Sequence, residues 1–195
     1  MTVHTSLYSK TRRGESILEM MMTMFIIVLV MTIMTSTFIS MYNTYSIYST
    51  RGLLLRNTSD MMQSVATYAN ESFAIATTHV YNGTTYTASP TTAIFQIASI
   101  NASGAAIATT YDYVIVTVNP ANAAQLLEIT DADATSSRKD RTRVFGDGVT
   151  QYRFSYRNAD PATSNDVFFM VTLKKAANHT SITYTNQIYA KLRNY

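Results

Sequence analysis

The carboxylate of Glu19 stands at the edge of a long apolar segment. Glu19 follows Ile17 and Leu18, and the next charged residue along the chain is Arg51. A carboxylate at the edge of an apolar helix is costly unless it stays at the water interface or finds a partner. Glu19 therefore predicts either a plain anchor residue at lipid headgroup depth or one half of an ion pair in dry surroundings.

The other residues that could do chemistry form no familiar catalytic pattern. His4, His79 and His179 are scattered without metal-ligand spacing, and the sequence has no nucleophile-elbow, zinc-helix or phosphate-loop motif. The chain contains no cysteine, so it has neither a disulfide nor a thiolate metal site. We expect no enzyme activity, no catalytic residue, no cofactor and no metal.

Four aspartates allow an alternative interpretation as a calcium loop. They are Asp131, Asp133, Asp140 and Asp147. The segment lacks the Gly and the closing Glu of an EF-hand, and basic residues crowd it. We favour a solvated loop and keep the calcium site as the alternative.

Aromatic and basic side chains gather at residues 152–157 and could stack on the bases of DNA. They are Tyr152, Arg153, Tyr156 and Arg157. Alternating residues on one strand explain them as well. The formal net charge of +3 comes from Lys10, Arg12 and Arg13, without which basic and acidic residues are equal in number. We therefore expect no nucleic-acid partner.

Residues 20–39 predict a transmembrane helix. They read MMMTMFIIVLVMTIMTSTFI, with no charge, Pro or Gly. At ~1.5 Å per residue they span ~30 Å, the thickness of the hydrocarbon core, and we place the span at about residues 17–39. A buried core helix is rarely apolar all round, and a secretory signal would be shorter and end in small residues. The basic residues before the span favour a cytoplasmic N-terminus and an external C-terminal domain.

The segment Arg12-Arg13-Gly14-Glu15-Ser16-Ile17-Leu18-Glu19 resembles the class III leader of type IV prepilins. In that family a short basic leader ends in Gly, and Glu is the fifth residue of the mature helix. The resemblance implies that prepilin peptidase cuts between Gly14 and Glu15, that the new amine is methylated, and that Glu19 is the filament-assembly residue. The basic residues of the leader would be Lys10, Arg12 and Arg13.

Physical chemistry supports the role that the resemblance gives to Glu19. In a bundle of identical helices, the free amine of one subunit can neutralise Glu19 of the next and fix the axial register. Family members usually begin with Phe or Met where this chain has Glu15, which adds a second negative charge beside the expected amine. The C-terminal Leu192-Arg193-Asn194 resembles the end of J-type minor pseudopilins. Both features favour a minor pilin or pseudopilin over a major pilin.

A helical pattern continues beyond the span. Apolar residues recur at steps of three, four or seven, and no Pro interrupts residues 15–89. These residues are Tyr45, Tyr48, Leu55, Met62, Val65, Ala69, Phe73 and Ala76. They predict one spine helix over residues 15–76, in which Gly52 could mark a kink or a join.

Short β-segments are expected from residue 78 onward. Val80–Thr85 predicts a hairpin, because Asn82-Gly83 supplies the positive φ angles of a type I′ turn. Further strands are expected at Ala93–Ile100, Tyr111–Val118, Val149–Tyr156, Val167–Leu173 and Tyr184–Leu192. Pro120–Ile129 predicts a short helix, and Thr130–Arg143 a loop.

These patterns predict an α+β fold, in which a long N-terminal membrane-spanning spine helix packs on an antiparallel β-sheet head, the pilin fold. We expect a leader peptide at 1–14, the spine helix at 15–76 and an extracytoplasmic β-rich head at 77–195.

The resemblance implies a structural subunit of a type IV filament system, either a pilus or a type II secretion pseudopilus. The chain would span the cytoplasmic membrane with its N-terminus in the cytoplasm and then enter an extracellular or periplasmic filament. Its partners would be prepilin peptidase, other pilin or pseudopilin subunits, the inner-membrane assembly platform and membrane lipid. The alternative is a permanently membrane-anchored surface adhesin or sensor, which has no use for Gly14 or Glu19.

Overall fold

The computed structural model describes residues 11–178 and 180–193 of the 195-residue chain, with side chains from Ile17 onward. The chain divides into two compact units at the junction of Ile47 and Tyr48. In chain order the elements are α1 (Thr11–Glu71), β1 (Ser72–Ile75), β2 (Thr78–Tyr81), β3 (Thr84–Thr87), β4 (Thr92–Ile100), β5 (Ala106–Asn119), β6 (Asn122–Asp131), β7 (Arg141–Asp147), β8 (Val149–Tyr156), a 3-10 turn (Pro161–Thr163), β9 (Asp166–Ala177) and β10 (Thr180–Lys191).

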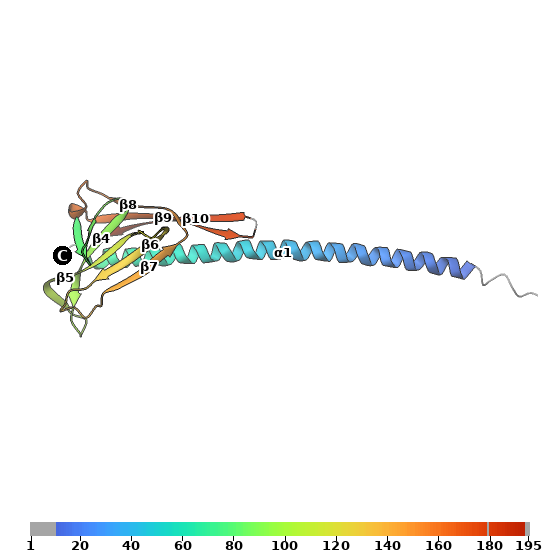
Figure 1. Ribbon diagram of the computed structural model, residues 1–195, viewed down its shortest axis with the longest axis horizontal. Coiled ribbons are helices and arrows are strands. Elements are labelled where there is room, and N and C mark those ends of the chain that lie inside the picture. Colours follow the sequence, from blue (N-terminus) through green and yellow to red (C-terminus); the bar gives the residue numbers. More distant parts are fainter. Residues whose placement is uncertain (1–10, 179, 194–195) are drawn as a thin grey trace, which may run out of the picture. The chain divides into compact units, whose positions relative to one another are not determined.

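The first unit holds the N-terminal part of α1 (Figure 1). Every side chain from Ile17 to Tyr42 is exposed. Apolar residues occupy all faces of this helix instead of one stripe, so no single face is set aside for a protein core.

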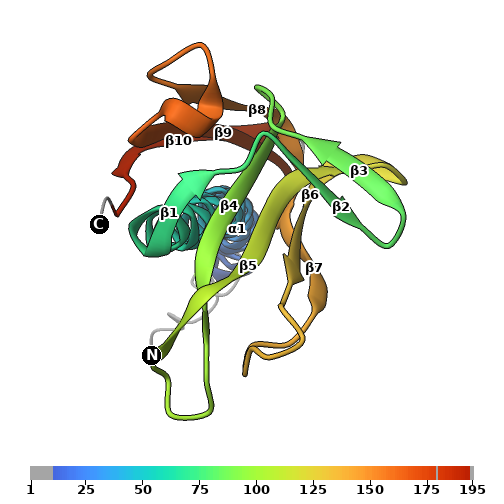
Figure 2. The same ribbon diagram turned by 90° about the vertical axis from the view of Figure 1, so that its left-hand side faces the viewer.

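In the second unit the C-terminal turns of α1 pack against antiparallel sheets (Figure 2). One sheet has the strand order β1-β4-β5-β6-β7 and another the order β10-β9-β8. The remaining pair, β2 and β3, places Tyr81 and Tyr86 on a small cluster of Ile94, Ile115 and Ile129. This architecture confirms the predicted α+β fold with one long N-terminal helix on antiparallel sheet.

The helix contributes a stripe of buried residues to the core of the second unit. The stripe consists of Leu54, Met61, Met62, Val65 and Ala69. Residues three, four, seven or eight positions apart share one helix face, which explains why these side chains are buried together. The sheets meet them with aromatic side chains, among which Phe154 and Phe169 are stacked with their ring centroids 4.6 Å apart.

The sequence placed part of this stripe correctly. Met62 and Val65 are buried as predicted, whereas the prediction that Tyr45, Tyr48 and Leu55 belong to the packed face is wrong, because all three are exposed. The buried face passes through Leu54, one position before Leu55, and 100° of rotation per residue separates neighbours on a helix.

The end of the helix and the segment after β5 differ from the predictions. The helix ends at Glu71, five residues before the predicted end, because Ser72–Ile75 pairs with β4 as strand β1. The short helix predicted at Pro120–Ile129 is wrong, since Asn122–Asp131 forms β6 between β5 and β7. Hydrogen bonding of this segment to β5 on one edge and to β7 on the other outweighs the weak helix preference that Pro120 indicates.

The hairpin and strand predictions agree with the structure. Asn82 and Gly83 have φ angles of 47° and 76°, as a type I′ turn between β2 and β3 requires. The five predicted strands correspond to β4, β5, β8, β9 and β10. The loop predicted at Thr130–Arg143 is shorter at both ends, because β6 extends to Asp131 and β7 begins at Arg141. The helix α1 continues through Gly52.

Gly148 joins β7 to β8 where two backbones approach closely. Its φ is +70°, and a Cβ at this position would lie 2.7 Å from the carbonyl oxygen of Lys174. Gly148→Ala should therefore lower the free energy of unfolding by roughly 2–4 kcal/mol, because it adds a clash to a left-handed backbone. Thermal or denaturant unfolding of the variant measures this loss.

Gly104→Ala is the matched control. Gly104 also has a positive φ, +81°, but no heavy atom lies within 4 Å of the Cβ that the substitution adds. This variant should lose only about 1–2 kcal/mol, the cost of the left-handed backbone alone. Equal losses in the two variants would contradict the role given to the close backbone approach at Gly148.

Candidate functional site

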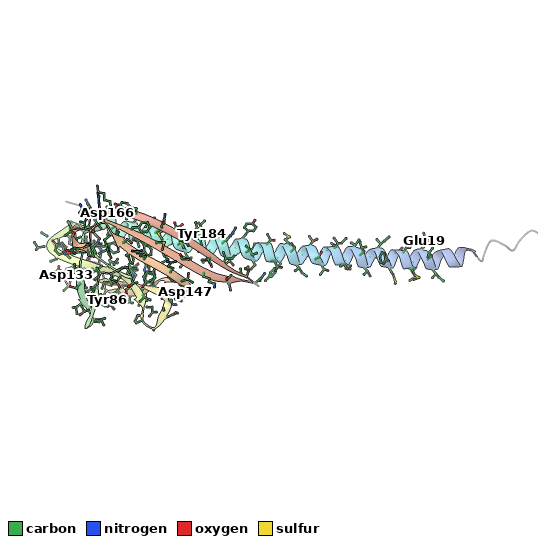
Figure 3. All side chains as sticks on the ribbon, turned by 90° about the horizontal axis from the view of Figure 1, so that it is seen from above. Glu19, Tyr86, Asp133, Asp147, Asp166 and Tyr184 are labelled. Atoms are coloured by element: carbon green, nitrogen blue, oxygen red, sulfur yellow. The ribbon has the colours of Figure 1, made fainter. Side chains whose placement is uncertain are left out.

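Glu19 presents an exposed side chain on α1 (Figure 3). Its backbone carbonyl accepts a hydrogen bond from Thr23 Oγ1 at 2.7 Å. Among the side chains that the structure describes, from Ile17 onward, no ion pair involves the Glu19 carboxylate.

The predicted processing residues come shortly before Glu19. Arg12, Arg13, Gly14 and Glu15 belong to the first turns of α1, and Lys10 lies outside the described residues. Their roles as leader and cleavage site stay predictions.

Five hydroxyl groups in the exposed segment after Glu19 are hydrogen-bonded to the backbone of their own helix. In the described part of the chain, α1 is the one helix long and apolar enough to cross a membrane, and none of its most apolar window is buried. Hydroxyl groups in this segment donate to backbone carbonyls three or four residues earlier, in Thr23, Thr32, Thr35, Ser36 and Thr37. These bonds satisfy the hydroxyl donors without water, which is absent from the hydrocarbon core of a bilayer. The helix thus supports single-pass membrane anchoring.

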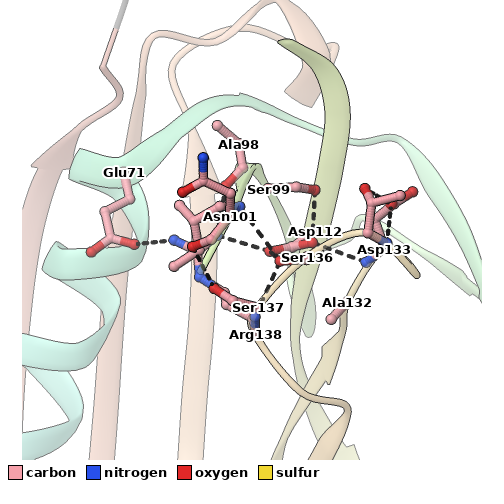
Figure 4. A network of polar contacts seen from close by, with 12 residues as sticks. Glu71, Ala98, Ser99, Asn101, Asp112, Ala132, Asp133, Ser136, Ser137 and Arg138 are labelled. Carbon is pink, nitrogen blue, oxygen red and sulfur yellow. Dashed lines mark hydrogen bonds and ion pairs between the residues drawn. The ribbon is translucent and has the colours of Figure 1, made fainter. Parts of the chain in front are cut away.

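The second unit contains a fully buried carboxylate at Asp112 in β5 (Figure 4). Its Oδ1 accepts hydrogen bonds from Ser99 Oγ at 2.8 Å and from the Asp133 amide at 2.9 Å. Its Oδ2 accepts from Ser136 Oγ and Arg138 Nη1, both at 2.8 Å. Burial alone would raise the pKa of Asp112, but the bond from Arg138 and the other donors hold it below its ordinary value.

Arg138 connects this carboxylate to the end of α1. Its Nη1 also donates to the carbonyl of Ala98 at 2.6 Å, and its Nη2 lies 3.4 Å from Glu71 Oε2. The loop between β6 and β7 is therefore tied to β4, β5 and the last turn of the helix (Figure 4).

A second buried carboxylate, Glu128 in β6, joins β7 to the helix. Arg143 makes two bonds to it at 2.8 and 2.6 Å, Arg141 makes one at 2.9 Å, and Tyr68 Oη of α1 donates at 2.7 Å. Burial opposes ionisation of Glu128, yet the bonds from Arg143 and Tyr68 hold its pKa below the ordinary value. Burial of the Tyr68 hydroxyl, together with its hydrogen bond to the negatively charged Glu128, raises the pKa of Tyr68 to about 12.

Neither carboxylate has the environment of a catalytic acid or base. The oxygens of each already accept several hydrogen bonds from cations or hydroxyls, which leaves them engaged within the protein. Between the clusters lies a cleft of about 530 Å³, lined by Tyr68, Glu71, Ile97, Val114, Thr130, Arg138, Lys139, Asp140 and Arg141. The two arginines that line it, Arg138 and Arg141, are already paired with acids. The clusters serve to hold strands, loop and helix together.

The four aspartates of the calcium alternative do not converge. The Oδ2 atom of Asp131 lies 2.6 Å from Nε2 of His79, whose ring stacks on Tyr113. The carboxylate of Asp133 accepts a hydrogen bond from the Thr135 amide. The carboxylate of Asp140 accepts one from the Ala132 amide. Across residues 11–178 and 180–193, no group of three or more His, Asp or Glu side chains is placed to hold a metal ion.

The aromatic residues considered for base stacking face the interior. Tyr152 and Tyr156 pack against the core, and their hydroxyls donate to the carbonyls of Thr91 and Thr92 at 3.3 and 3.1 Å. Their rings are therefore engaged in packing, as expected of alternating strand residues.

Comparisons with known proteins give no family. No protein-family model matches the chain, and no curated protein is significantly similar to it. The roles of its residues therefore rest on the sequence and on the geometry described above.

The buried acids are the residues that the sequence interpretation missed. Asp112 interrupts the apolar strand YDYVIVTV, and Glu128 interrupts QLLEIT. A charge inside an apolar strand is a signal for a buried ion pair, because lone charges are rarely buried. The cationic partners come from Arg138, Arg141 and Arg143, in the region expected to be a solvated loop.

Proposed function

We propose that the chain is a structural, non-enzymatic subunit of a type IV filament system, either a pilus or a type II secretion pseudopilus. Within that system it serves as a minor pilin or pseudopilin. One observation carries the proposal: the only charge between Ile17 and Thr50 is the exposed Glu19, at the edge of a helical segment that is apolar on all sides. The last turns of the same helix belong to a β-rich unit.

The proposed sequence of events begins in the cytoplasmic membrane. The helix anchors the chain with its N-terminus in the cytoplasm, and prepilin peptidase removes residues 1–14 by cutting after Gly14. The amine of Glu15 is then methylated, and the assembly platform extracts the subunit into an extracellular or periplasmic filament. There the amine of one subunit pairs with Glu19 of its neighbour, and a dry environment makes that pair strong.

The test is the N-terminal residue of the full chain purified from membranes after co-expression with an active prepilin peptidase. We expect a mature chain that begins at Glu15, with a methylated amine visible by mass spectrometry. Gly14→Ala should remain uncut, because the peptidase of this family cuts after Gly. Gly52→Ala, on the same helix with open space around the added Cβ, should be cut as the wild type is.

A wild-type chain that still begins at Met1, beside a reference prepilin that is cut in the same cells, would contradict the proposal. The permanently anchored adhesin or sensor would then be the better interpretation of the exposed helix.

A further inference from the structure

Two exposed lysines lie near the turn of the β9–β10 hairpin. Lys174 pairs with Thr183, and Lys175 pairs with Ile182. Successive strand residues point to opposite faces, so the two side chains leave the hairpin on opposite sides. Both lysines are exposed, and no ion pair within the described residues engages them.

The same end of the second unit carries two arginines of α1. Ile182 and Tyr184 pack against the core that includes Leu54, and the hairpin runs beside the part of α1 that belongs to this unit in two views (Figures 1 and 3). Arg51 and Arg56 lie on either side of Leu54 along the helix, and both are exposed. We call these four residues, Arg51, Arg56, Lys174 and Lys175, the basic end.

Acidic residues offset this charge only in part. Asp60 approaches Arg56 at 4.0 Å, with both side chains well exposed. Asp147 is exposed next to Gly148, whose carbonyl accepts from the Lys174 amide at 2.8 Å. The four cations therefore outnumber the two acids beside them, and the basic end keeps a net positive charge.

The covalent chain limits the distance between the basic end and the membrane. Arg51 follows Ile39 by twelve residues, which is ~18 Å as a helix and at most ~43 Å for a fully extended chain. Three exposed tyrosines, Tyr42, Tyr45 and Tyr48, occupy the chain in between. Tyrosine is enriched where a membrane helix leaves the hydrocarbon core, so headgroups are expected close to the basic end.

We propose that the basic end binds anionic lipid headgroups while the chain is anchored in the membrane. Basic residues near a membrane surface attract anionic lipids, and the attraction falls off within a Debye length. This docking goes beyond the filament role; it rests on membrane anchoring by α1 but not on cleavage or assembly. It would hold the second unit against the bilayer until extraction.

The absence of cysteine from the chain permits a clean measurement. A single Ala176→Cys substitution, at an exposed position of the hairpin, carries a fluorophore on the full, uncut chain in vesicles. The vesicles contain phosphatidylcholine alone or with phosphatidylglycerol, plus a lipid whose headgroup quenches the fluorophore. We expect quenching to be roughly two- to threefold greater with phosphatidylglycerol, and the excess to disappear near 1 M salt, where the Debye length is ~3 Å.

Charge reversal then tests the lysines themselves. Lys174→Glu with Lys175→Glu should abolish the excess quenching. Lys191→Glu is the matched control, because Lys191 is an exposed lysine on the same hairpin but opposite Asp166, at the far end from Ala176. It should leave the excess unchanged. Thermal unfolding of each variant checks that the second unit remains folded.

Three results would overturn the proposal. The first is equal quenching in the two kinds of vesicle. The second is a loss of the excess quenching in Lys191→Glu as large as the loss in the double variant of Lys174 and Lys175. The third is binding of added DNA to the basic end that is as tight as binding of phosphatidylglycerol. Failure of peptidase cleavage would contradict the filament role but would not affect the lipid-binding result, because the vesicle experiment uses the uncut chain.

Discussion

Glu19→Ala should reduce incorporation of the chain into filaments by roughly a hundredfold or more. In the proposed filament, the substitution leaves the amine of the neighbouring subunit as an unpaired charge in a dry helical bundle. Removing one partner of a buried ion pair costs about 3–5 kcal/mol, which corresponds to this factor. Quantitative immunoblots of the sheared filament fraction, normalised to the membrane fraction, measure the change.

Asp60→Ala provides the matched control for Glu19. Asp60 is an exposed acid on the same helix, and its contact with Arg56 is long, at 4.0 Å. Its loss should change incorporation by less than about twofold, as expected for an exposed ion pair. Filaments that contain the Glu19→Ala chain at the wild-type level would show that the carboxylate has no part in assembly.

Glu128→Ala should be among the most destabilising single substitutions in the second unit. It would leave Arg141, Arg143 and Tyr68 without the buried acceptor that they share. We expect a loss of about 3–5 kcal/mol and a fall in Tm of roughly 10 °C. Circular dichroism of the full chain in detergent during heating measures the change.

The exposed acid Asp147 gives the comparison for Glu128. Asp147→Ala should stay within about 0.5 kcal/mol of the wild type, as is usual for surface substitutions. A Glu128→Ala chain that melts at the same temperature as Asp147→Ala would contradict a stabilising role for the buried cluster.

The pH dependence of stability follows from the same two carboxylates. The folded protein holds the pKa values of Glu128 and Asp112 below their ordinary values. Each therefore contributes stability that is fully present above its unfolded pKa, about 4, and is lost as the pH falls through the lower folded pKa. Glu128→Ala should flatten the decline in stability below about pH 4, because one of the carboxyl groups whose pKa is held low in the folded protein no longer titrates.

The local conformations that the sequence predicted correctly depend on neighbours in the chain. The Asn82-Gly83 turn follows from the backbone freedom of its two residues. The exposed helix from Ile17 follows from an uninterrupted apolar run. Glu19 could be singled out for a similar reason, since its isolation among apolar residues is visible without any fold.

The errors arise where distant residues decide. Pro120–Ile129 looks like the start of a helix, yet β5 and β7 pair with this segment on both edges and make it a strand. A stripe through Leu55 fits the helical period almost as well as one through Leu54 does, and only the placement of the sheets selects Leu54.

The amino-acid sequence by itself determined the apolar anchor, the position of Glu19 at its edge and the α+β class, because runs, periods and turn residues are local properties. The tertiary structure alone decided that Asp112 and Glu128 are buried and which arginines pair with them. It also decided that Lys174 and Lys175 lie near the turn of the β9–β10 hairpin. Burial and charge pairing depend on which strands and loops meet, and that is set by packing between segments far apart in the chain.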